Sequence, residues 1–103
     1  MGGRGGKAFS GVLAAQLRFH GCRSLKERRA PVRSLLDRLR NRGLSAAQVG
    51  PTGDVRFAWI AAGCVSGSAS GVEKLLERAR QLLYDPRWEV MRTGMDIFET
   101  ELE

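Results

Sequence analysis

A strict alternation of side chains from Phe9 to Phe19 constrains the fold more than any other feature of the sequence. The odd positions are all apolar or glycine, whereas polar residues occupy even positions such as Gln16 and Arg18. A period of two places alternate residues on opposite faces of a β-strand. We therefore predict a long strand over residues 8–20 that packs its odd-numbered face on a core.

The next segment has the features of a helix. Ser24 and Glu27 have the spacing of a capping box, in which the two side chains satisfy free amides at a helix start. Apolar residues then recur at helical spacing, and Gly43 is typical of a position just after a helix end. The prediction is a helix over 24–42. Pro31 removes one helical hydrogen bond and favours a kink, although the alternative is a main helix that begins at this proline.

A second amphipathic helix is predicted over 70–84, opened by a capping box of Ser70 and Glu73. Asp85-Pro86 ends it. Three further segments have the composition of strands, with a turn at 50–54 and a nearly continuous apolar run in the second of them. These strands are predicted over 45–49, 55–65 and 88–102.

The predicted order is strand, helix, strand, strand, helix, strand. This order is typical of an α+β, ferredoxin-like βαββαβ fold, a four-stranded antiparallel sheet with two helices on one face. Right-handed crossovers place the first and third strands in the middle. We expect a Gly-rich, flexible leader over 1–7 and a single domain over 8–103.

Composition narrows the class of protein. Apolar residues make up 43% of the chain and charged residues 27%, which is typical of a globular domain. No apolar run approaches the ~20 residues of a membrane span, and the start lacks a secretory signal, so a cytoplasmic protein without membrane contact is expected. His20, Cys22 and Cys64 do not have metal-site spacing, and we predict no metal or cofactor.

Catalytic patterns are also missing from the sequence. The chain has one histidine without an apparent nucleophile partner, and the clustered carboxylates Glu99, Glu101 and Glu103 are typical of a solvated strand face. No phosphate-binding glycine loop follows a predicted strand. We therefore predict that the protein is not an enzyme.

Charge is unevenly distributed along the chain. The formal net charge is +6, but residues 1–53 carry eleven basic and two acidic side chains, whereas residues 54–103 carry six and nine. Nine of the basic residues lie between Arg18 and Arg42. Such a concentration attracts polyanions, of which nucleic acid is the commonest in the cytoplasm; the alternative is a solvated helix flank that keeps the protein soluble.

The segment 21–29, Gly-Cys-Arg-Ser-Leu-Lys-Glu-Arg-Arg, resembles the helix entry of the YlxP-like family of small bacterial proteins. Residues 46–50 and the pair Val72-Glu73 extend the resemblance over most of the chain. It implies a ferredoxin-like fold, no established activity, and genes that often lie beside those for translation initiation and ribosome maturation. The sequence departs from the family at Pro31 and over 52–57.

We therefore expect a non-catalytic protein that associates with RNA or a ribosomal subunit, with a role in ribosome maturation or translation. At 100° per residue, four cations of the first helix fall within one arc beside its apolar stripe, and another basic residue precedes the helix. Guanidinium groups suit phosphate contact, but the sequence indicates no aromatic platform for reading bases. The predicted nucleic-acid-binding residues are Arg23, Lys26, Arg29, Arg33 and Arg40.

The alternative function is a protein-interaction module without a nucleic-acid role. If Phe57, Trp59 and Val65 point into the core, small apolar residues of the first and third strands cover the open sheet face. That face would bind a partner protein or form a homodimer. The residues expected there are Val12, Ala14, Ala58, Ile60 and Ala62.

Overall fold

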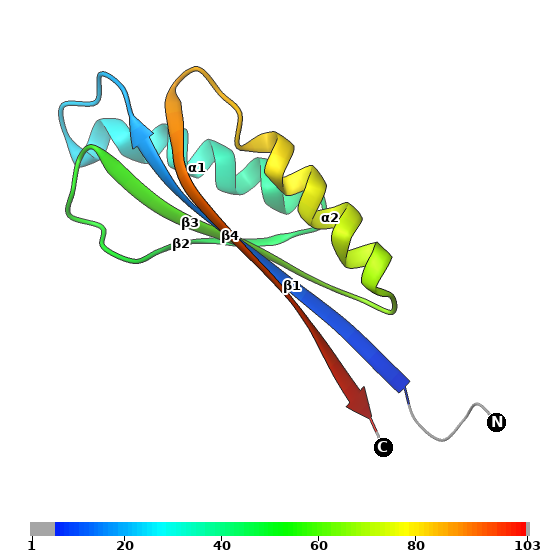
Figure 1. The fold of residues 1–103 in the computed structure, drawn as a ribbon. Helices are drawn as coiled ribbons and strands as arrows, with labels where there is room; N and C mark the ends of the chain where they lie inside the picture. The colour runs from blue at the N-terminus through cyan, green and yellow to red at the C-terminus, as the bar shows by residue number, and fades with distance from the viewer. Residues whose placement is uncertain (1–5, 103) are drawn as a thin grey trace.

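The computed structural model describes residues 6–102, which form the predicted six elements (Figure 1). All strand pairs are antiparallel, and the order of elements confirms the ferredoxin-like α+β fold. The elements are β1 (Gly6–Phe19), α1 (Leu25–Asn41), β2 (Ser45–Val49), β3 (Phe57–Ser66), α2 (Ala69–Leu82) and β4 (Trp88–Leu102).

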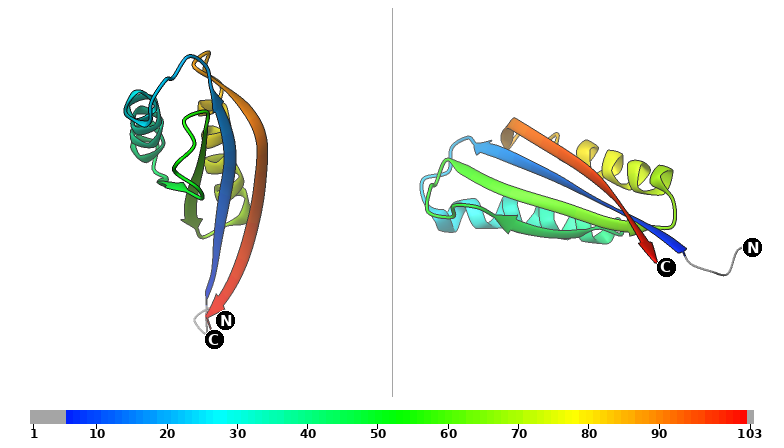
Figure 2. Two further views of the ribbon diagram at one scale, coloured as in Figure 1. Left: turned by 90° about the vertical axis from the view of Figure 1, so that its left-hand side faces the viewer. Right: turned by 60° about the horizontal axis from the view of Figure 1, so that its bottom comes forward.

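The strand order in the sheet is β2-β3-β1-β4, so the first and third strands are central, as predicted. Both helices pack on the same face of the sheet, while the other face is open (Figure 2). The alternation in β1 is confirmed, because Leu13 and Leu17 are buried in the core beneath the helices. Gly11 lies directly under α2, where an added Cβ would come within 2.5 Å of Val72 Cγ1. A larger residue there would push the helix away from the sheet.

The helix predictions are correct in position and differ in detail. α1 runs through Pro31 without interruption, so the alternative in which the helix begins at this proline is wrong. The N-cap of α2 is Ser68, whose side chain accepts a hydrogen bond from the amide of Gly71, rather than the predicted Ser70. The helix therefore starts one residue before its predicted range, at Ala69.

β1 also begins earlier than predicted. Gly6 and Lys7, assigned to the flexible leader, are strand residues that pair with Leu102 and Glu101 of β4. Residues 1–5 of the predicted leader lie outside the described residues. The paired ends of β1 and β4 project beyond the helices (Figure 1), and the radius of gyration is 15.8 Å, compared with about 13 Å for a compact domain of this length.

Asp85 organises the connection between α2 and β4. Its carboxylate accepts hydrogen bonds from the Arg87 amide at 2.8 Å and from the Arg87 guanidinium at 2.9 Å, and it lies 3.7 Å from Arg38 Nη1. These bonds lower the pKa of Asp85 to about 2, with the Arg87 side chain as the largest cause. A carboxyl group with a lowered folded-state pKa stabilises the protein above its unfolded pKa of about 4, and this contribution is lost as the pH falls through 2.

Asp85→Asn is therefore expected to lower the free energy of unfolding by about 1–2 kcal/mol at pH 7. The deficit should shrink as the pH falls from about 4 toward 2, because the wild-type carboxylate is then protonated. Urea unfolding across this pH range measures the change, with Glu89→Gln at an exposed position nearby as the control. A deficit that does not change with pH would contradict the assignment of the effect to carboxylate ionisation.

Candidate nucleic-acid interface

The entry of α1 forms the capping arrangement that the sequence predicts. The Ser24 hydroxyl accepts from the Glu27 amide at 3.1 Å, and Glu27 Oε2 accepts from the Arg23 amide at 2.7 Å. These bonds occupy amides that would otherwise attract an anion. The Arg23 side chain is therefore an exposed cation beside a capped helix entry.

Three of the predicted cations remain together on the outer face of α1. Lys26, Arg29 and Arg33 are all exposed, and none of them forms a salt bridge within residues 6–102. Their spacing of three and four residues places them in a row that spans about 10 Å along the helix. We call these three residues the α1 basic row.

Arg40 departs from the prediction. It belongs to the same arc, but Nη2 donates to the Ala46 carbonyl at 2.7 Å, and Nη1 lies 3.6 Å from an Asp37 carboxylate oxygen. Asp37 lies just beside the arc, at a position that the sequence analysis did not consider. Arg40 therefore links α1 to β2 and its charge is partly compensated, which separates it from the α1 basic row.

Arg28 has a structural role that the sequence analysis did not identify. It is 4% exposed, and its guanidinium donates hydrogen bonds to the carbonyls of Thr52, Asp54 and Phe57. The bond to Thr52 measures 3.2 Å. Backbone carbonyls, rather than a carboxylate, solvate this buried cation, so Arg28 holds the β2–β3 connection against α1.

The open sheet face differs from the expectation. Ala58, Ile60 and Ala62 are at most 1% exposed and belong to the core, so the predicted interface loses three of its five residues. Val12, 42% exposed, lies on the open face together with the half-buried Ala14.

Aromatic side chains of β3 take the place of those three residues on the open face. Phe57 and Trp59 pair with Arg18 and Gln16, which are on the face of β1 opposite the core. Their ring centroids lie 6.0 Å apart, and the Arg56 guanidinium lies 5.4 Å from the Phe57 centroid. The prediction that this face lacks aromatic residues is therefore wrong.

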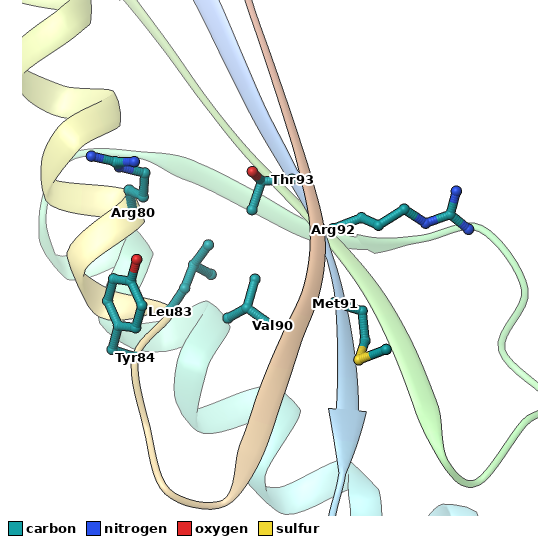
Figure 3. A pocket seen from close by; sticks show the side chains of 7 residues that line it. All are labelled: Arg80, Leu83, Tyr84, Val90, Met91, Arg92 and Thr93. Carbon is teal, nitrogen blue, oxygen red and sulfur yellow. The ribbon is translucent and has the colours of Figure 1, made fainter.

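A hollow of about 250 Å³ lies on the helix side, between the end of α2 and β4 (Figure 3). Arg80 of α2 and Tyr84 just after this helix form one wall, and Val90 and Thr93 of β4 form the other. Arg80 bonds to Glu77 at 3.2 Å, which raises the pKa of this arginine and compensates its charge. Arg92 also belongs to the lining, but Figure 3 shows its side chain extending to the other side of β4, away from Tyr84 and Arg80.

Comparison with known proteins places the chain in a family. Within residues 6–102, no helix is both long and apolar enough to cross a membrane. No curated protein matches the sequence. A family whose description reads "Protein of unknown function (DUF503)" has a model that matches residues 11–95. These residues include α1, α2, β2 and β3 in full and most of β1 together with the first half of β4. The chain therefore belongs to the DUF503 family.

Proposed function

We propose that this protein is a non-catalytic RNA- or ribosome-associated protein that contacts phosphates through α1. The observation that carries the proposal is the α1 basic row of Lys26, Arg29 and Arg33, which is exposed and forms no salt bridge among the described residues. Solvated cations in a row attract a polyanionic backbone and bind it by releasing counterions.

The resemblance of residues 21–29 to the YlxP-like family supports the same function. Genes of that family often lie beside those for translation initiation and ribosome maturation. The resemblance covers the entry of α1, where Arg23 and Lys26 lie, and a role in ribosome maturation or translation is consistent with it. The cytoplasm is the compartment that this role requires.

The alternative interaction module has weaker support. The surface predicted for it consists of small apolar residues, and the three from β3, Ala58, Ile60 and Ala62, are in the core. The open face carries Trp59, Gln16 and Arg92 beside Val12 and Ala14, so it is more polar and more aromatic than a self-associating apolar face requires. We therefore prefer the nucleic-acid function.

The test is the salt dependence of binding to a short, fluorescently labelled oligouridylate. Three phosphate contacts predict a slope of log K against log salt of about −2.1 on single-stranded RNA, and Arg29→Gln with Arg33→Gln should flatten it by about 1.4. Both side chains are exposed, so the stability of the double variant should change little. Fluorescence anisotropy across a salt series measures the slope, and co-sedimentation with ribosomal subunits applies the same comparison to the larger partner.

The matched control removes two positive charges from the other helix. Lys74 and Arg78 are exposed on α2 and form no salt bridge within residues 6–102, so Lys74→Gln with Arg78→Gln changes the net charge equally. This control should keep the wild-type slope. Equal flattening in both double variants would show that only net charge matters and would contradict a site on α1.

A further inference from the structure

The open sheet face contains a shallow hollow of about 260 Å³. Ala14 and Gly94, which are paired across β1 and β4, leave space at its centre because their side chains are small or absent. Trp59 and Val49 line the side toward β2. Gln16 and Arg92 line it from β1 and β4, with Arg92 Nε donating to Gln16 Oε1 at 3.2 Å.

A β-bulge directs Arg92 onto this face. The register between β1 and β4 shifts so that Leu17 pairs with Val90 and Gln16 pairs with Arg92, which leaves Met91 as the extra residue. Figure 3 shows the result, since Val90 and Thr93 point toward α2 whereas Arg92 extends to the other side of β4. Without the extra residue, alternation would turn position 92 toward the helices. Bulges of this kind commonly re-aim a side chain beside a functional site.

The chemistry of the lining is selective. Among the described residues that line the hollow, Arg92 is the only charged one, and it forms no salt bridge within residues 6–102. Its guanidinium suits a phosphate, while Trp59 supplies an aromatic surface and Gln16 an amide. The volume lies just below the ~300 Å³ of the smallest drug-sized sites, which suits one planar ring system.

We propose that this hollow is a stacking site for one unpaired base of single-stranded RNA. Trp59 contacts the ring face of the base, and Arg92, held by Gln16, binds the adjacent phosphate. The choice of RNA as the ligand rests on the proposed function. The hollow is nevertheless separate from the α1 basic row, because α1 covers the opposite face of the sheet (Figure 2). The α1 basic row supplies affinity that depends on salt, whereas the hollow supplies affinity that depends on the presence of a base.

The experiment compares two RNA oligonucleotides of equal length and charge, an oligoadenylate and its fully abasic counterpart. Stacking of one base predicts that wild type binds the oligoadenylate about tenfold more tightly, and the oligoadenylate alone should quench the emission of Trp59. The other tryptophan, Trp88, is 4% exposed in the core and should not respond. The quenching measurement needs no variant and so does not depend on the folding of one.

Variants then separate the two surfaces. Trp59→Ala should bind both oligonucleotides with the abasic affinity and keep the wild-type salt slope, and Trp59→Phe should retain part of the preference. Arg29→Gln with Arg33→Gln should flatten the slope and keep the preference. Equal wild-type affinity for both oligonucleotides, without quenching, would overturn the stacking site and leave the function of α1 standing. A preserved base preference with an unchanged slope in the α1 double variant would overturn the proposed role of α1 instead.

Discussion

Replacing Ile60 with lysine is expected to unfold the protein. Ile60 is fully buried in β3 and belongs to the hydrophobic core, so the variant would place an ammonium group there without a partner. Burial of an unpaired charge costs several kcal/mol, in addition to about 2 kcal/mol of lost apolar burial. This sum is comparable with the total stability of an ordinary domain, about 5–15 kcal/mol.

Circular dichroism and urea unfolding measure this loss of structure. The control is Val65→Lys on the same strand, where the native side chain is 73% exposed, and its free energy of unfolding should stay within about 0.5 kcal/mol of wild type. A folded Ile60→Lys protein with wild-type stability would contradict the assignment of Ile60 to the core.

Replacing Arg28 with methionine is expected to destabilise the protein by about 3 kcal/mol. Methionine retains much of the aliphatic bulk but leaves the carbonyls of Thr52, Asp54 and Phe57 without their shared donor. Hydrogen bonds to a charged group contribute about 1.5–3 kcal/mol each, and the restored solvation of the loop offsets part of the loss.

Urea unfolding gives the stability difference, and amide hydrogen exchange locates it. Exchange should accelerate in residues 52–57 before it accelerates in the central strands. Arg29→Met, at the exposed neighbouring position, is the control and should leave both measurements unchanged. Equal stability losses in the two variants would show that the hydrogen bonds of Arg28 do not hold the loop.

The sequence predicts the elements well because their periodicity is local. In β1, polar residues alternate with apolar ones, so the buried face can be recognised directly. In β3 both faces are apolar, and assigning the larger rings of Phe57 and Trp59 to the core gave the wrong face. Side-chain size would have identified the buried face of β3, because helices packed closely over a sheet require small residues beneath them. Gly11 in β1 and Ala58 and Ala62 in β3 are such residues.

The site was predictable only where it depends on one helix. Helical geometry correctly groups Lys26, Arg29 and Arg33, and the same geometry places Asp37 three residues before Arg40, a pairing readable from spacing alone. Arg28 is buried because residues 50–56, which connect β2 to β3, pack against α1. No local sequence pattern predicts this packing. The direction of Arg92 depends on a bulge at Met91, which appears only when β4 pairs with β1.

The pairing of β1 with β4 also determines the order in which the fold can be completed. Gly6 lies opposite Leu102, and Phe19 lies opposite Trp88. The central strand β1 therefore has β4, the last strand in chain order, as one of its two neighbours. During synthesis, β1 keeps an open edge until β4 is available, although β3 and both helices are already present. Contacts between residues so distant along the chain carry a large loop-closure cost, so folding should be slower than that of a helical bundle of the same length. We therefore expect the closure of this edge to be a late step of assembly, and the hollow around Arg92 to form with it.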